Sequence, residues 1–121
     1  EAGPDSVDFS KPISNGPTTR GFDYFYGIIA SLDMAPYVYV ENDMPTALPD
    51  RVTVNDGMKY WRKGPTASDF DHEQTLPNFI NRAVDYIHDK SKEDKPFYLY
   101  LPLPAPHTPI LPIKEYQGKS A

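Results

Sequence analysis

The feature that most restricts the fold of this chain is a run of apolar residues between Pro96 and Leu103. Residues 97–101 read FYLYL, so apolar side chains fall on both alternating faces of an extended chain. This pattern is typical of a strand that is covered on both faces in a parallel sheet. We therefore predict a buried strand over about residues 97–101. One helix cannot cover both faces, so we expect the other neighbours to come from further chain or from other copies, and the isolated chain to expose apolar surface.

An amphipathic helix is predicted just before this strand. Apolar residues between positions 76 and 87 recur at offsets of 0, 3, 4, 7, 8 and 11, the stripe expected for a helical period of about 3.6 residues. Thr75 suits the N-terminal cap, and His88 and Lys90 place basic groups near the C-terminus. We predict a helix over about residues 75–89 that packs on a sheet through Phe79, Ile80, Ala83, Val84 and Ile87. The stripe consists of Leu76, Phe79, Ile80, Ala83, Val84 and Ile87.

The rest of the chain is rich in residues that interrupt regular structure. It contains 14 prolines among 121 residues, more than twice the number that an average usage of ~5% gives. We interpret residues 1–20 as an irregular connector, because glycine and proline interrupt any period there. Residues 37–40 and 51–54 predict short strands, and residues 61–65 indicate an exposed turn. The predicted fold class is α/β, with one clear helix, one buried strand and much irregular loop.

Charge and composition argue against several classes of function. The formal net charge is −5 and no run is rich in Lys or Arg, which argues against a nucleic acid partner. No stretch approaches the ~18 apolar residues that cross a bilayer, so no membrane partner is expected. The sequence has no cysteine, which excludes a disulfide, a thiolate metal site and a cysteine nucleophile.

His107 is the strongest candidate for a chemical role. It follows the predicted strand within the sequence PAPHTP, and ligands of open α/β sheets bind outside the carboxyl ends of the strands. Pro106 and Pro109 restrict the backbone, so we expect the imidazole on a stiff loop. The pattern leaves a second interpretation equally open, in which His107 only forms a hydrogen bond to a neighbouring backbone group.

Four blocks occur in the order seen in type I sulfatases of the arylsulfatase class. They are GFDYFYG at 21–27, the helix at 76–88, KPFYLYL at 95–101 and PHTP at 106–109, and the most specific part is the sequence PFYLYLPLPAPHTP. The chain thus resembles this family over most of residues 20–117. The resemblance implies an internal part of an alkaline phosphatase-like α/β sandwich, with residues 21–121 as a partial sulfatase catalytic domain. It also implies that His107 contacts the sulfate and protonates the departing alcohol.

The function implied by the resemblance is hydrolysis of sulfate esters of carbohydrates or aryl alcohols. The family nucleophile is a formylglycine made from Cys or Ser in a Cys/Ser-x-Pro-x-Arg motif, and this chain lacks both that motif and the Asp and Asn ligands of the family's calcium ion. We expect no cofactor or metal site in this chain, calcium and formylglycine in the complete enzyme, and no activity of the isolated chain. The implied partners are a sulfated small molecule or glycan and the remainder of the sulfatase domain. The resemblance favours a periplasmic or secreted location.

Asp33 is a second candidate for substrate binding, because the corresponding loop of sulfatases approaches the active-site rim. Its carboxylate is predicted either to bind a sugar hydroxyl or to form a local turn before Pro36. A group of polar residues before the helix is interpreted as capping and solvated charge rather than as a metal site. This group consists of Asp69, Asp71, His72 and Glu73.

Two other functions remain open. One is a phosphodiesterase of the same superfamily, which only the nucleophile motif would distinguish from a sulfatase. The other is a non-catalytic carbohydrate-binding module, in which aromatic rings form a platform for a sugar. The rings considered for this platform are Tyr24, Phe25, Tyr26, Tyr37, Tyr39 and Trp61.

Overall fold

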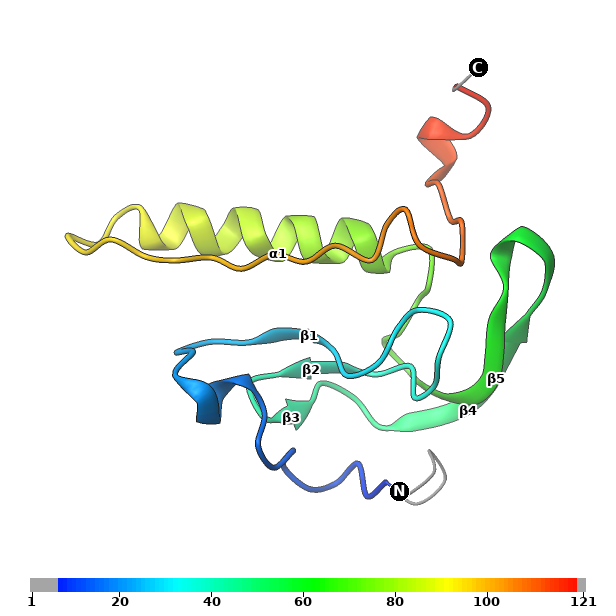
Figure 1. Ribbon diagram of the computed structural model, residues 1–121, viewed down its shortest axis with the longest axis horizontal. Helices are drawn as coiled ribbons and strands as arrows, with labels where there is room; N and C mark the ends of the chain where they lie inside the picture. Colours follow the sequence, from blue (N-terminus) through cyan, green and yellow to red (C-terminus); the bar gives the residue numbers. More distant parts are fainter. Residues whose placement is uncertain (1–6, 120–121) are drawn as a thin grey trace.

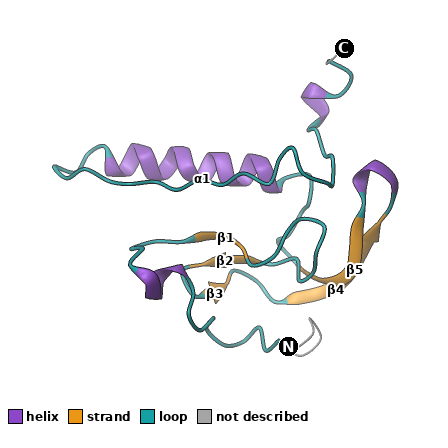
Figure 2. Cartoon of the chain, in the orientation of Figure 1, coloured by secondary structure: helices purple, strands orange, loops and turns teal. Residues whose placement is uncertain are grey.

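The computed structural model describes residues 7–119 and combines one α-helix with two small antiparallel sheets (Figures 1 and 2). This mixed composition of helix and strand agrees with the coarse class predicted from sequence. The parallel sheet expected around residues 97–101 is not found in the described range, because every strand pair in both sheets is antiparallel. Of the connector predicted at residues 1–20, residues 1–6 lie outside the described range.

The described part of the chain contains five strands, one α-helix and three 3-10 helices. The strands are β1 (Tyr26–Ile28), β2 (Tyr39–Glu41), β3 (Met44–Pro45), β4 (Pro49–Asn55) and β5 (Trp61–Ala67). The α-helix is α1 (Thr75–Lys90), and the 3-10 helices are η2 (Pro17–Arg20), η3 (Gly57–Lys59) and η4 (Lys114–Tyr116). Among the described residues, no helix has the length and apolar character to cross a membrane.

The core is built around residues 37–40, of which the last two begin β2. Their side chains are between 0% and 3% exposed. β2 lies between β1 and β3 in the first sheet, and α1 lies over that sheet (Figure 1). The Tyr37 N–H donates to the Pro65 carbonyl and the Ala67 N–H donates to the Tyr37 carbonyl, both at 2.9 Å, so the run is also attached to β5. The short strand predicted at residues 37–40 is therefore confirmed at Tyr39 and Val40.

β4 and β5 form a hairpin that extends away from the core (Figure 1). The strand predicted at residues 51–54 is confirmed, because it lies within β4. The exposed turn predicted at residues 61–65 is wrong, because these residues belong to β5. A Cβ atom on Gly64 would lie 2.0 Å from the Ala35 Cβ, so the absence of a side chain permits the loop at residues 31–36 to lie against the hairpin.

The helix predicted at residues 75–89 is confirmed, with one correction at its N-terminus. Thr75 does not cap α1, but is its first residue and is fully buried. Its Oγ1 donates to the Asp71 carbonyl at 2.9 Å. Asp71 Oδ1 accepts the Glu73 N–H at 2.8 Å, so Asp71 stabilises the turn that precedes the helix.

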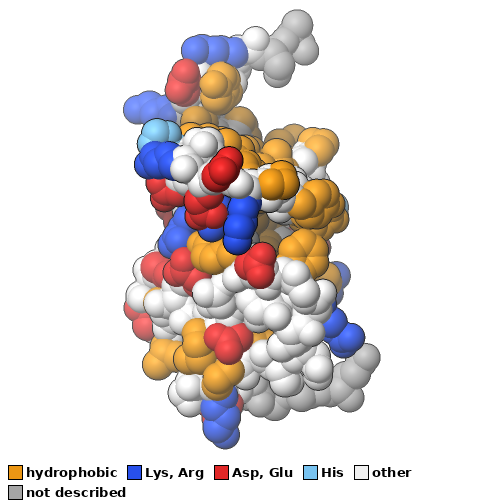
Figure 3. All heavy atoms as spheres, turned by 90° about the vertical axis from the view of Figure 1, so that its left-hand side faces the viewer, with side chains coloured by type: hydrophobic (Ala, Val, Ile, Leu, Met, Phe, Trp, Pro, Cys, Tyr) orange, Lys and Arg blue, Asp and Glu red, His pale blue; other side chains and the backbone are white. Residues whose placement is uncertain are grey.

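Only part of the predicted apolar stripe of α1 packs on the sheet. Phe79 and Ala83 are buried, and the Phe79 ring meets the Tyr26 ring edge-on with centroids 6.0 Å apart. The packing prediction is wrong for Ile80, Val84 and Ile87, which are exposed because the described residues supply no layer against that side of the helix. Hydrophobic side chains accordingly gather beside charged ones in the upper half of the surface seen in Figure 3.

The segment after α1 returns along the helix as an extended chain (Figure 1, orange). The buried strand predicted at residues 97–101 is wrong, because these residues join no ladder and are 37% to 76% exposed. A strand requires a neighbouring strand for its backbone N–H and C=O groups, and the described residues supply none here. We call residues 96–110 the return segment.

Candidate active site

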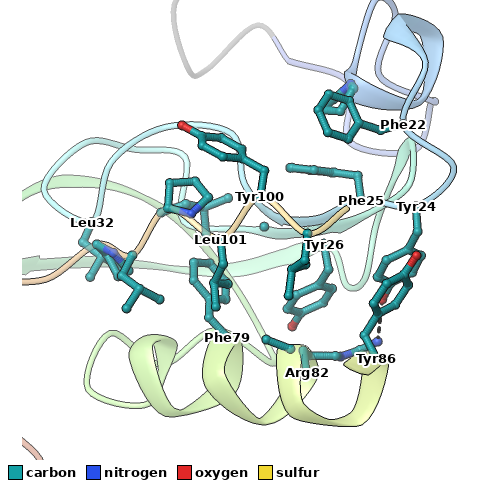
Figure 4. Close-up of a pocket in the computed structure, with 18 of the residues that line it drawn as sticks. Phe22, Tyr24, Phe25, Tyr26, Leu32, Phe79, Arg82, Tyr86, Tyr100 and Leu101 are labelled. Carbon is teal, nitrogen blue, oxygen red and sulfur yellow. Dashed lines mark hydrogen bonds between the residues drawn. The ribbon is translucent and has the colours of Figure 1, made fainter. Parts of the chain in front are cut away.

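A cavity of about 620 Å³ opens between β1, α1 and the return segment (Figure 4). Its walls are mainly apolar and aromatic, and they come from parts of the chain that are far apart in sequence. In Figure 4 the Phe79 ring projects from α1 toward Leu101 of the return segment. The labelled residues that line the cavity are Phe22, Tyr24, Phe25, Tyr26, Leu32, Phe79, Arg82, Tyr86, Tyr100 and Leu101.

Arg82 brings a positive charge to the cavity wall, and the reasoning from sequence missed it. Its Nη1 lies 2.8 Å from Glu41 Oε1 and 3.1 Å from the Tyr24 hydroxyl oxygen. Its guanidinium carbon lies 4.1 Å from the centroid of the Tyr26 ring. The available signal was helical spacing, since Arg82 follows Phe79 by three residues and shares its side of α1.

The charge of Arg82 is compensated within the cavity wall. The Tyr24 hydroxyl donates to Glu41 at 2.8 Å, and this hydrogen bond together with the Arg82 charge lowers the pKa of the Glu41 carboxyl. Burial and the Glu41 carboxylate raise the pKa of Tyr24, so its hydroxyl stays protonated. The three side chains therefore hold one another in place.

His107 lies on the loop that follows the extended part of the return segment, and its exposed side chain also lines the cavity. Its Nδ1 is 2.6 Å from the Thr108 carbonyl oxygen. A carbonyl oxygen only accepts, so the proton of this hydrogen bond resides on Nδ1 and Nε2 is the nitrogen available to a ligand. The peptide bonds Ala105–Pro106 and Thr108–Pro109 are both cis. Both interpretations stay open, because the ring bonds to the backbone and also borders a cavity.

Asp33 does not share the cavity wall with His107. Its neighbours Ser31 and Leu32 line the cavity, but Asp33 itself does not. Its carboxylate accepts a hydrogen bond from the Ser31 hydroxyl, and its backbone carbonyl accepts the Arg62 N–H at 3.1 Å. Burial and the nearby Asp33 charge raise the pKa of Tyr37 to about 12. The structure thus gives Asp33 a local role beside the cavity.

The acidic residues before α1 take part in local contacts. Asp69 Oδ2 accepts the Thr46 hydroxyl at 2.6 Å, and Glu73 Oε1 lies 2.6 Å from Lys59 Nζ. Within residues 7–119, no three His, Asp or Glu side chains converge in the manner of metal ligands.

His72 differs from the solvated group that was predicted. It is 6% exposed, and its ring stacks on Trp61 with centroids 3.8 Å apart and 10° between the planes. Burial lowers the pKa of His72 to about 4, and Nε2 has no hydrogen-bond partner in the described part of the chain. The ring is therefore a neutral part of the packing that joins β5 to the turn before α1.

The six aromatic rings considered for a sugar platform do not share one surface. Tyr37 and Tyr39 are buried in the core, and Trp61 packs on His72. The other three rings, of Tyr24, Phe25 and Tyr26, line the cavity that also contains His107.

Comparison with known proteins finds a similarity to a sulfatase. No model of a known protein family matches this chain. The chain is 29% identical over 147 aligned residues to N-acetylgalactosamine-6-O-sulfatase of Bacteroides thetaiotaomicron, in an alignment that covers 94% of this chain. The chain is thus similar to part of a sulfatase. It spans 29% of the length of this sulfatase.

Proposed function

We propose that this chain is part of a sulfatase and that His107 belongs to the active site. Similarity to a sulfatase over 94% of the chain supports the family, and the position of His107 on a cavity wall supports the site. In this proposal residues 21–121 form part of a catalytic domain with an alkaline phosphatase-like sandwich, and residues 1–20 are a connector. The remainder of the domain covers the exposed apolar side chains of α1 and of the return segment.

The proposed reaction is hydrolysis of a sulfate ester of a carbohydrate or an aryl alcohol. In the overall hydrolysis, a bond forms between sulfur and the oxygen of water as the bond between sulfur and the alcohol oxygen breaks. The electron pair of the broken bond stays on the alcohol oxygen. A sugar alkoxide is strongly basic and therefore requires a proton as it departs. His107 in its imidazolium form donates this proton from Nε2, while Nδ1–H stays bonded to the Thr108 carbonyl and holds the ring in orientation.

The formylglycine and calcium of the family do not fit the residues of this chain. The sequence has no cysteine and no Cys/Ser-x-Pro-x-Arg motif, and residues 7–119 contain no group of three metal-ligating side chains. In the proposal, this chain therefore contributes only to sulfate contact and to the leaving group. His107 is better suited to sulfate contact than Arg82, because Glu41 already compensates the Arg82 charge at 2.8 Å.

The proposed substrate class is a sulfated carbohydrate, by analogy with the relative, whose name specifies the 6-O-sulfate of N-acetylgalactosamine. Asp33 is proposed to accept a hydrogen bond from a sugar hydroxyl. This is supported by its partial exposure and by its position next to the cavity-lining residues Ser31 and Leu32. The contact with sugar then lies beside the cavity rather than inside it.

The test compares two leaving groups in the complete enzyme. His107→Ala is expected to lower kcat roughly 10²–10⁴-fold on a sugar sulfate, because the alkoxide loses its proton donor. On an activated aryl sulfate the loss is expected to be considerably smaller, because a phenolate departs without a proton. His88→Ala is the matched control, since His88 is exposed on α1 and does not line the cavity, and both rates should be unchanged.

Three outcomes would contradict parts of this proposal. Equal losses on both substrates with a large fall in melting temperature would remove His107 from the active site. Turnover of a phosphodiester in place of a sulfate ester would indicate the phosphodiesterase. Binding of a sulfated sugar by the complete protein without any turnover would indicate the carbohydrate-binding module.

A further inference from the structure

The β4–β5 hairpin reaches the loop that carries His107. At its tip, η3 presents the Met58 carbonyl, which accepts the Ile110 N–H at 2.9 Å. Ile110 follows directly after Pro109, which is the buried residue of this loop. We propose that the hairpin tip is a positioning element for His107, acting through the backbone bond between Met58 and Ile110. This inference rests on the proposed function of His107.

In the part of the chain that the structure describes, the hydrogen bond from the Ile110 N–H to the Met58 carbonyl has no neighbouring hydrogen bond that could replace it. Within the described range, residues 96–119 form no other hydrogen bond to the rest of the chain, from either backbone or side chain. The remaining bonds of this region are internal, as in the donation from the His107 N–H to the Pro104 carbonyl at 3.2 Å. Among the described residues, the hydrogen bond between Ile110 and Met58 is therefore the one polar contact that orients the His107 loop relative to the core. Among these same residues, all other contacts of the loop with the core are apolar.

Side-chain contacts hold the hairpin tip against the core. The tip can therefore fix the position of the His107 loop that is bonded to it. Lys59 Nζ lies 2.6 Å from Glu73 Oε1, which joins η3 to the turn before α1. Trp61, two residues further on, stacks on the buried His72 at 3.8 Å between centroids. Trp61 Nε1 also donates to Thr53 Oγ1 at 3.2 Å and holds the two strands of the hairpin together.

Gly57 directly precedes Met58 in η3, so its backbone conformation affects where the Met58 carbonyl lies. Its φ angle is +62°, a conformation that β-branched residues strongly disfavour and that Asn tolerates. A Cβ atom at this position would meet no atom within 4 Å. Substitutions at Gly57 therefore test backbone conformation separately from steric overlap.

The experiment uses the complete sulfatase and the two leaving groups already described. Gly57→Val is expected to lower kcat on a sugar sulfate about 10- to 100-fold, because misplacing a catalytic group by about 1 Å costs up to this factor. The loss on an activated aryl sulfate should be smaller, as for His107→Ala. Gly57→Asn should restore most of the rate, since Asn adopts the required φ angle. Gly118→Val is the matched control, because Gly118 also has a positive φ, of +71°, and no atom within 4 Å of an added Cβ.

A double variant and an exchange measurement separate this inference from the proposed function. In a His107→Ala background, Gly57→Val should cost little more on the sugar sulfate, because the group that it positions is gone. Amide hydrogen exchange of the peptide around Ile110, followed by mass spectrometry, should be faster in Gly57→Val than in wild type. Faster exchange with no leaving-group-dependent loss overturns the positioning role while His107 keeps its role. A His107→Ala variant without the leaving-group difference refutes the proposed function itself.

Two further outcomes concern general destabilisation by Gly57→Val and failure of this variant to fold. Equal loss on both substrates in Gly57→Val, without recovery in Gly57→Asn, overturns the inference in favour of general destabilisation. Should Gly57→Val not fold, Lys59→Gln removes the brace to Glu73 and is scored on the same two substrates. A fall in kcat that is smaller than that expected for Gly57→Val but again greater on the sugar sulfate than on the aryl sulfate supports the inference. No such difference between the two substrates refutes it.

Discussion

Two segments of this chain have nearly the same apolar pattern and opposite environments. Residues 37–40 read YVYV and are 0% to 3% exposed, whereas residues 97–101 read FYLYL and are 37% to 76% exposed. The first segment contacts β1, β3 and β5 through backbone bonds, and the second has no strand beside it in the described range. A continuous apolar run therefore shows which side chains a segment is able to bury, while its neighbours in the fold decide whether they are buried.

The largest expected effect compares two tyrosines, one from each segment. Tyr39 is 3% exposed and its hydroxyl is 2.9 Å from Thr75 Oγ1, whereas Tyr100 is 66% exposed. Tyr39→Ala is expected to lower the free energy of unfolding by about 3–5 kcal/mol, because it leaves a large cavity in the core. Tyr100→Ala should change it by less than about 0.5 kcal/mol. Urea denaturation of the 121-residue chain measures both.

A result in which the two tyrosine variants lose similar stability would contradict the difference in burial. Tyr39→Phe is the milder control, since it removes only the hydroxyl, whose oxygen lies 2.9 Å from Thr75 Oγ1 and 3.4 Å from the Asp71 carbonyl oxygen. Its expected cost is about 1 kcal/mol, typical of one hydrogen bond.

The difference in burial between the two segments should disappear when the rest of the sulfatase is present. Leu101 is 39% exposed here, so Leu101→Ala should cost less than about 1 kcal/mol in the isolated chain. In the complete sulfatase, where the remainder of the domain is proposed to cover the return segment, the same change should cost about 2–5 kcal/mol. Thermal unfolding of the matched pair in both proteins measures the difference. Equal small costs in both would mean that the return segment stays uncovered.

Local sequence patterns predicted α1 well, because its periodicity and terminal charges depend on neighbouring residues only. They misassigned β5, since Gly64 and Pro65 normally interrupt strands. Gly64 is present for a reason that is remote in sequence, namely the close approach of Ala35, where an added Cβ would come within 2.0 Å. No local pattern contains that contact.

The candidate site shows the same division. The position of His107 after an apolar run and between prolines made it a candidate from sequence alone. The cavity was not predictable, because its walls combine residues around β1 with α1 and the return segment. Nor was the bond between Met58 and Ile110, which joins residues that are distant along the chain.

The last expected effect is a pH dependence of stability that comes from His72, which packs beside the buried segment. His72 lies beside Tyr37, with ring centroids 4.4 Å apart, and burial lowers its pKa from the ordinary 6.5 to about 4. The Arg51 charge lowers this pKa further, and the Asp71 charge opposes it. Between pH 6.5 and about 4, the unfolded chain binds a proton at His72 that the folded chain does not. The contribution of neutral His72 to stability is thus fully present above pH 6.5 and falls as the pH is lowered toward about 4, with a slope of at most about 1.4 kcal/mol per pH unit from this group.

His72→Phe retains a ring against Trp61 and removes the titration, so the unfolding free energy of this variant should vary less with pH across this window. Because carboxylates titrate in both proteins, the informative quantity is the difference between the two urea-denaturation curves from pH 4 to 7. Parallel curves would show that His72 binds its proton over the same pH range in the folded and unfolded chains. The aromatic packing around the buried segment would then be looser than the 3.8 Å stack on Trp61 implies.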